Sequence, residues 1–167
     1  MRVLGIDPSL TSTGLVIVEN GQVKRSKAVK TNSSQTWIER IRIIETNITK
    51  FSEISDVIYM ENYAYGSRFG RETAGELGGV IKRCLYLLGK KPVLISPTKV
   101  KKFATGQGNT PPCPDSEAKS TWTKKWVMKN VKEKYGYEFD TDDETDAFVI
   151  ALIGETVESV SSSVSLS

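Results

Sequence analysis

The pair Asn20-Gly21 constrains the fold of this chain more than any other feature of the sequence. It follows an apolar run over residues 15–18, and Asn-Gly between two apolar runs is a strong signal for a two-residue β-hairpin turn. With a first strand over residues 2–6 and a third over 22–29, the chain is predicted to begin as an antiparallel meander. Such a beginning is unlike a doubly wound nucleotide-binding fold, in which strands and helices alternate from the start.

Helices and short strands are predicted after the meander. Apolar residues recur at helical spacing from Trp37 to Phe51, behind a capping box formed by Thr36 and Glu39. The remaining predicted elements are strands over 56–60 and 92–95, helices over 73–88, 116–135 and 145–158, and a loop over 104–114. This order predicts an α/β domain with a mixed sheet. We expect residues 1–158 to form one domain and the serine-rich residues 159–167 to form a flexible tail.

Composition excludes several classes of function. The 167 residues include no histidine, so no mechanism can use imidazole as a base or as a metal ligand. No run reaches the about 18 apolar residues of a transmembrane helix, and Asp7 interrupts the early apolar run, so neither a membrane span nor a signal peptide is expected. Cys84 and Cys113 lack metal-type spacing and are expected to be free thiols in a reducing compartment. The net charge of +3 permits nucleic-acid binding without requiring it.

Acidic residues stand at the ends of three predicted elements. Asp7 ends the first strand, Glu61 follows the fourth, and Asp142, Asp143 and Asp146 open the last helix. Each alone can be a turn residue, a surface charge or a helix cap. Parallel neighbouring strands, however, bring Asp7 and Glu61 to one sheet edge, where converging carboxylates repel unless a cation joins them. Hard divalent cations prefer such oxygen ligands, and two of them can drive phosphodiester cleavage without histidine.

Three segments together resemble one protein family. They are GIDPSLTSTG at residues 5–14, YMENYAYG at 59–66 and DDETDAFVIA at 142–151. Their order and spacing resemble the RuvC family of Holliday-junction resolvases, which are dimeric nucleases of the ribonuclease-H-like superfamily, and the resemblance extends over residues 1–152. Ser9 stands where the family usually has glycine. The divergent loops favour a phage-type member that acts in the cytoplasm of a bacterial host.

The resemblance implies a fold, a cofactor and a reaction. The fold is ribonuclease-H-like, a five-stranded mixed sheet whose first three strands are antiparallel, flanked by helices. Asp7, Glu61, Asp143 and Asp146 would bind two Mg²⁺ ions, which Mn²⁺ could replace, whereas Asp142 is either an alternative ligand or a helix cap. Water would attack the phosphate and leave a 5′-phosphate and a 3′-hydroxyl. A homodimer formed through the glycine-containing helix over 73–88 would cut two opposed strands of a four-way DNA junction.

Basic and aromatic residues supply the candidates for DNA contacts. Lysines give salt-sensitive phosphate contacts, and aromatic rings among arginines can stack on unpaired bases at a branch point. The resemblance implies that one lysine approaches the scissile phosphate, and Lys119 and Lys124 are both candidates for this catalytic role. The other candidates are Tyr63, Tyr65, Arg68, Phe69, Arg71, Lys99, Lys101, Lys102 and Lys125.

Three other functions also fit parts of the pattern. An actin-like kinase fold begins with a similar strand, aspartate and turn, but it needs a much longer chain. A branched-DNA-binding module without catalysis would not need all four acids. A nuclease acting on forks, flaps or RNA–DNA hybrids would share both the metal site and the fold.

Overall fold

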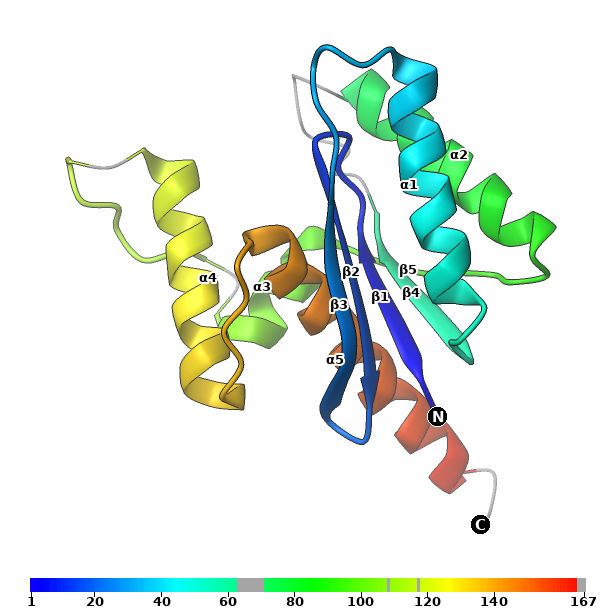
Figure 1. Ribbon diagram of the computed structural model, residues 1–167. Coiled ribbons are helices and arrows are strands. Elements are labelled where there is room, and N and C mark those ends of the chain that lie inside the picture. The colour runs from blue at the N-terminus through cyan, green and yellow to red at the C-terminus, as the bar shows by residue number, and fades with distance from the viewer. Residues whose placement is uncertain (63–70, 108, 117, 165–167) are drawn as a thin grey trace.

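A computed structural model of the chain describes residues 1–62, 71–107, 109–116 and 118–164 (Figure 1). Its centre is one five-stranded sheet with the strand order β3-β2-β1-β4-β5. Strands β1 (Val3–Asp7), β2 (Ser12–Glu19) and β3 (Gln22–Lys30) are antiparallel, whereas β4 (Val57–Glu61) and β5 (Val93–Ile95) extend the sheet in parallel from β1. The predicted α/β fold with a five-stranded mixed sheet and an antiparallel beginning is therefore confirmed.

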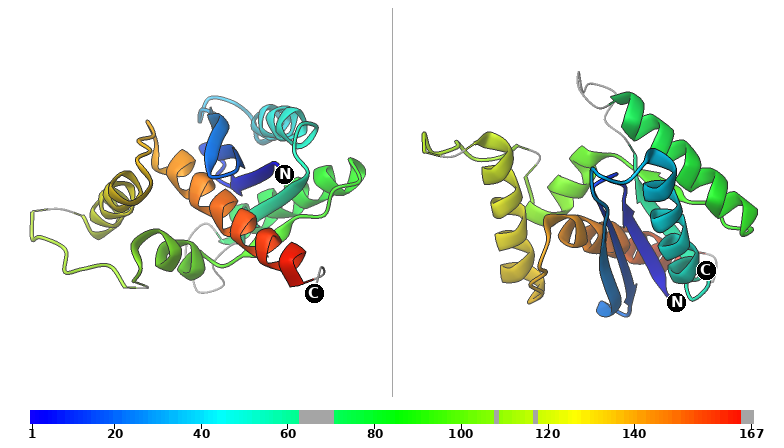
Figure 2. Two further views of the ribbon diagram at one scale, coloured as in Figure 1. Left: turned by 90° about the horizontal axis from the view of Figure 1, so that it is seen from below. Right: turned by 45° about the horizontal axis from the view of Figure 1, so that its top comes forward.

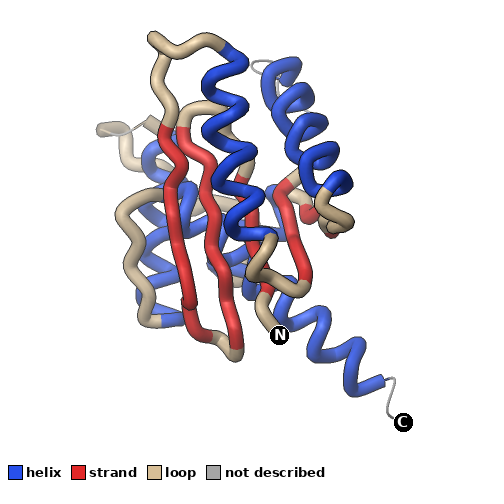
Figure 3. The backbone as a smooth tube through the Cα atoms, turned by 45° about the vertical axis from the view of Figure 1, so that its right-hand side comes forward, coloured by secondary structure: helices blue, strands red, loops and turns tan. Residues whose placement is uncertain are grey.

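Helices cover both faces of the sheet. The two helices α1 (Trp37–Ser52) and α2 (Arg71–Leu87) lie on one face (Figures 1 and 3). Helix α5 (Asp142–Val164) crosses the other face, where α3 (Pro97–Thr105) and α4 (Lys119–Tyr135) pack beside it (Figure 2). Side chains alternate along β1, so that Leu4 and Ile6 join the core under α1 and α2 while Val3 joins the core under α5.

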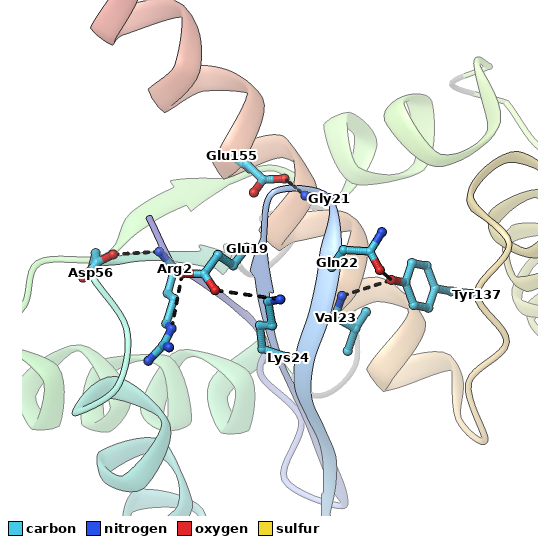
Figure 4. Close-up of polar contacts among 9 residues, drawn as sticks. All are labelled: Arg2, Glu19, Gly21, Gln22, Val23, Lys24, Asp56, Tyr137 and Glu155. Atoms are coloured by element: carbon cyan, nitrogen blue, oxygen red, sulfur yellow. Dashed lines mark hydrogen bonds and ion pairs between the residues drawn. The ribbon is translucent and has the colours of Figure 1, made fainter.

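The local signals in the sequence produce the predicted turns and caps. Asn20 and Gly21 have positive φ angles of 54° and 72°, as a two-residue hairpin turn requires. Thr36 and Glu39 form the reciprocal capping box of α1. The hairpin turn lies at the end of the sheet that is opposite to the acidic residues. There the Gly21 N–H donates to the carboxylate of Glu155 in α5 over 2.8 Å (Figure 4). The hairpin is thereby fastened to α5.

The helices differ from the predictions in number and in extent. Helix α2 begins two residues before and ends one residue before the predicted bounds, and α4 begins three residues later than predicted. Helix α3 was not predicted, although Ser96 caps it and Pro97 occupies its first position, where a missing N–H is harmless. Its last residue, Thr105, falls inside the predicted loop. Helix α5 starts three residues earlier than predicted and continues to Val164, and in its last part the hydroxyl of Ser159 donates to the carbonyl oxygen of Glu155. The division into a domain over 1–158 and a flexible tail over 159–167 stays a prediction.

Two predictions made from the composition can be compared with the structure. Within the described ranges, no helix is long and apolar enough to cross a membrane. Cys84 and Cys113 both lie in these ranges, and neither forms a disulfide.

Candidate active site

The carboxyl ends of β1 and β4 bring Asp7 and Glu61 together. These strands are parallel neighbours in which Ile6 is paired with Met60, so the next residue of each strand reaches the same sheet edge. The two carboxyl groups are close enough for the charge of Glu61 to raise the pKa of Asp7. The predicted convergence of these two acids is therefore present in the structure.

Two glycines in the sheet let α5 approach closely enough to add further acids. A Cβ atom on Gly5 would lie 1.9 Å from the carbonyl oxygen of Ala147, and one on Gly14 would lie 1.9 Å from that of Asp143. Gly14 is also the residue paired with Asp7 across the β1–β2 ladder. Because no side chain separates sheet and helix at this point, the first turn of α5 rests directly beside Asp7.

Burial and mutual repulsion disfavour the charged forms of the two strand-end acids. The pKa of Asp7 lies well above its ordinary value, first because the carboxyl is buried and then because Glu61 is close. Burial is also the main reason that the pKa of Glu61 is raised to about 7, and the charge of Asp146 adds to this increase. The hydrogen bond from Asp7 and the nearby Lys101 oppose the increase at Glu61.

The two acids on α5 behave in the same way. Burial raises the pKa of Asp146 well above its ordinary value, and the charge of Asp7 is the next cause. Burial also raises the pKa of Asp143, although the hydroxyl of Ser12 favours its charged form. Ser12 Oγ is itself buried, and within the described residues it has no hydrogen-bond partner of normal geometry. A buried hydroxyl beside Asp143 is thus available to support that carboxylate.

Asp142 differs from its neighbours. Its Oδ2 lies 2.5 Å from Nζ of Lys124, in an ion pair between α5 and α4. It does not cap the helix, because the hydroxyl of Thr141 accepts the Glu144 N–H at 3.2 Å. The hydroxyl of Thr141 also donates to the carboxylate of Glu144. Of the two roles that the sequence left open for Asp142, the cap is provided by Thr141, and the ligand role stays a prediction. The ion pair with Lys124 is a contact that the sequence did not indicate.

The turn after Asp7 is fixed by its own polar side chains. The hydroxyl of Thr13 donates to the carbonyl oxygen of Ser9 over 2.6 Å, and Arg40 of α1 donates to that of Leu10 over 3.2 Å. Within the described ranges, Asn20 is the one non-glycine residue with a positive φ. Ser9 therefore needs no glycine conformation, and its departure from the usual family residue does not disturb the turn.

The candidate lysines fall into different positions. Lys124 forms an ion pair with Asp142. Lys101 of α3 lies near enough to Glu61 for its charge to lower the pKa of that carboxyl group. Lys119 begins α4 and has no described contact with these carboxylates. The predicted DNA-binding residues Lys99, Lys102 and Lys125 are exposed on α3 and α4. Tyr63, Tyr65, Arg68 and Phe69 lie outside the described residues, and for Arg71 only the backbone in α2 is described.

The donor set fits a hard divalent cation. Asp7, Glu61, Asp143 and Asp146 offer only carboxylate oxygens, which Mg²⁺ and Mn²⁺ prefer. Across the described part of the chain, no group of three or more acidic, cysteine or histidine side chains is already arranged to hold a metal ion.

Sequence reasoning did not identify Ser12, Lys101 or Gly14 as parts of the acidic cluster's immediate surroundings. The position of Gly14 at the end of the segment GIDPSLTSTG was a usable signal, since a glycine facing an acid across a hairpin allows close approach. The place of Lys101 depends on α3, which was not predicted.

Comparison with known proteins relates this geometry to resolvases. The crossover junction endodeoxyribonuclease RuvC of Rhodopirellula baltica is 30% identical over 117 residues, covering 65% of this chain and 66% of the relative. RuvC of Mycobacterium ulcerans is 29% identical over 117 residues, covering 65% of this chain and 63% of the relative. The chain thus spans slightly less than two thirds of the length of these curated relatives. No family model matches the chain.

Solved structures show the same fold. Thermus thermophilus RuvC in complex with a Holliday junction substrate matches with a TM-score of 0.70 and 22% identity over 91% of each chain. The fowlpox virus resolvase in complex with Holliday junction DNA matches with a TM-score of 0.56 and 16% identity, over 96% of this chain and 99% of that one. The sheet and its flanking helices are therefore arranged as in these two proteins.

Proposed function

Because this chain belongs to the RuvC family of Holliday-junction resolvases, we propose that it is a metal-dependent endonuclease that cleaves phosphodiester bonds in branched DNA. Its main substrate is the four-way junction, which it resolves by paired nicks that leave 5′-phosphate and 3′-hydroxyl ends. The observation that carries the proposal is the convergence of Asp7, Glu61, Asp143 and Asp146, whose pKa values are all raised by burial and by neighbouring carboxylates.

Each residue of the site has a proposed role. Asp7, Glu61, Asp143 and Asp146 would hold two Mg²⁺ ions, for which Mn²⁺ can substitute. The chemistry that such a bound pair supplies is activation of water and stabilisation of the leaving oxygen. Because the pKa values of Asp7 and Glu61 are both raised, binding of the cation has to displace any proton that these carboxyl groups hold.

Lysines beside the carboxylates support the DNA-binding part of the proposal. Lys124 lies against the cluster through Asp142 and is our choice over Lys119 for the group that approaches the scissile phosphate. The exposed lysines Lys99, Lys102 and Lys125 extend the basic surface over α3 and α4, which both pack against α5. Phosphate contacts of this kind give affinity that falls with salt. The aromatic and arginine residues at 63–71 stay candidates for contacts at the branch point.

Exposed apolar side chains on α2 and β5 support the proposed homodimer. On α2, Tyr86 and Leu87 are 76% and 66% exposed, and on the edge strand β5, Val93 and Leu94 are 46% and 41% exposed. A Cβ atom on Gly75, also in α2, would meet nothing within 4 Å, so a second backbone has room to approach. Exposed large apolar side chains are common in protein interfaces, and these four are candidates for such contacts. A symmetric pair of chains would place two active sites on one junction.

A nicking assay tests the proposal. The substrates are a four-way junction, a three-way fork, a 5′ flap, plain duplex and an RNA–DNA hybrid of matched sequence, each with Mg²⁺, Mn²⁺ or EDTA. We expect paired nicks near the centre of the four-way junction, lost with EDTA and with Asp146→Asn. Faster cleavage of forks, flaps or hybrids would identify a broader nuclease on the same fold. Binding of the junction without cleavage of any substrate would identify a non-catalytic module. The phage origin and the cytoplasmic location stay predictions.

A further inference from the structure

The ion pair between Lys124 and Asp142 is a contact that the four proposed metal ligands do not explain. Nζ of Lys124 in α4 lies 2.5 Å from Oδ2 of Asp142, the first residue of α5, and the two side chains are 58% and 28% exposed. An ion pair as exposed as this contributes about 0–1 kcal/mol to stability, so its value to the fold is small. Its position directly before Asp143 places it at the margin of the carboxylate cluster.

The contacts of Lys124 distinguish Asp142 from the other acids. The hydrogen bond to Asp142 is the main reason that the pKa of Lys124 is raised, and Asp143 and Asp146 add to the effect only through their charge. The ammonium group is therefore held beside the cluster without occupying the oxygens of Asp143 or Asp146. A lysine has three N–H donors, and an exposed ammonium that gives one of them to Asp142 keeps others for a phosphate.

Asp142 is also less suited than Asp143 to be a metal ligand. Asp143 lies beside the buried hydroxyl of Ser12, whereas Asp142 forms an ion pair with Lys124 of α4. The helix cap is provided by Thr141, so Asp142 is not needed for that purpose. The described partner of Asp142 is Lys124, and the ion pair between them depends on the negative charge of Asp142.

We propose that Asp142 is a positioning residue that holds the ammonium of Lys124 at the entrance to the carboxylate cluster, where Lys124 meets the phosphate beside the cut. This rests on the proposed function, because the role exists only if the chain cleaves DNA. The lysine side chain is long and flexible, and without Asp142 it samples positions away from the phosphate. The effect falls on turnover and not on the affinity for the junction, since Lys99, Lys102 and Lys125 are also proposed to contact the DNA backbone.

A double-mutant cycle on the full chain tests this role. Cleavage of a four-way junction at saturating Mg²⁺ is measured for the wild type, Asp142→Asn, Asp142→Glu, Lys124→Ala and the double variant Asp142→Asn with Lys124→Ala. We expect Asp142→Asn to lower kcat by about tenfold with KM changed by less than about twofold, and Asp142→Glu to restore most of it. The double variant should be no slower than Lys124→Ala alone, because both changes remove one interaction.

Matched controls separate the alternatives. Lys129→Ala removes another α4 lysine in an ion pair, 3.7 Å from Glu133, and should leave kcat unchanged. Mn²⁺ binding measured by calorimetry should be the same for Asp142→Asn and wild type but at least about tenfold weaker for Asp143→Asn. Equal weakening by both changes would make Asp142 a ligand and overturn the proposal, as would additive losses of kcat in the cycle. A wild type that cuts no DNA would instead overturn the proposed function, and this role with it.

Discussion

Replacing Gly14 with alanine tests whether the spacing between α5 and the sheet sets the geometry of the active site. Gly14 lies opposite Asp7, and a Cβ atom there would stand 1.9 Å from the carbonyl oxygen of Asp143. Real Cβ atoms essentially never come within 3.0 Å of such an atom, so the first turn of α5 has to retreat by at least about 1.1 Å. The atoms that the new Cβ would meet belong to the backbone of Asp143 and Glu144, so no side-chain rotation relieves the clash.

This displacement affects activity more than stability. A misplacement of about 1 Å can lower turnover by about 100-fold, whereas overpacking one core contact costs about 1–3 kcal/mol. We therefore expect Gly14→Ala to fold, to lose about 1–3 kcal/mol of unfolding free energy, and to cleave a four-way junction about 100-fold more slowly. Single-turnover cleavage gives the rate, and urea denaturation gives the free energy of unfolding.

Gly154→Ala is the matched control. It crowds the same helix against the same sheet, because its Cβ atom would lie 2.5 Å from the ring of Tyr59 and 2.7 Å from Val3. It stands eight residues beyond Asp146, about 12 Å further along the helix. We expect a similar loss of stability with kcat within about twofold of the wild type. Cleavage at the wild-type rate by folded Gly14→Ala would refute the reasoning, and so would an equal loss of kcat in Gly154→Ala.

Three further predictions concern the charges of the site. Asp7→Asn should abolish cleavage in the nicking assay, leave junction binding in gel-shift assays as tight as in the wild type or tighter, and raise the Tm of the metal-free protein at pH 8 by removing a buried like charge. The metal-free wild type should lose stability as the pH rises from 4.5 to about 7, because in this range Glu61 releases its proton in the unfolded chain but keeps it in the folded one. The difference in pKa corresponds to on the order of 3 kcal/mol of unfolding free energy. Urea denaturation at several pH values should show this loss for the wild type and not for Glu61→Gln. Lys124→Ala should lower kcat, whereas Lys119→Ala should change only the salt-dependent affinity for the junction, as binding titrations at several salt concentrations can show.

Features set by neighbouring residues could be read from the sequence. The hairpin at Asn20-Gly21 and the capping box of Thr36 and Glu39 depend on a few adjacent residues, and both form as predicted. Helix α3 was missed because Pro97 resembles a strand terminator, although proline at a first helical position begins helices equally well. The sequence alone does not decide between these two uses of proline, since the choice depends on whether Val100 and Ala104 find a core to pack against.

In the candidate site, too, some features follow from the sequence pattern and others depend on tertiary packing. The meeting of Asp7 and Glu61 follows from two parallel strands, which the pattern of strands and helices indicated. The choice between Asp142 and Asp143 depends on the rotation of α5 about its axis and on where α4 lies beside it, and both are results of tertiary packing. Gly14 fixes the first of these by contact with the helix backbone, and the pairing of Lys124 with Asp142 depends on the second.

The raised pKa values favour a catalytic use of these acids over a structural one. A carboxyl group that serves only a structural purpose has no need of its charge, whereas an amide in the same place carries no charge to repel its neighbours. Asp7 and Asp146 are both buried, and each raises the pKa of another acid of the cluster, so their charges destabilise the metal-free fold at neutral pH. Lys101 and Lys124 stand at the margin and offset only part of this repulsion. An arrangement that is unfavourable in the empty protein becomes favourable when a divalent cation binds, which is why we expect the amide variants to be more stable and inactive together.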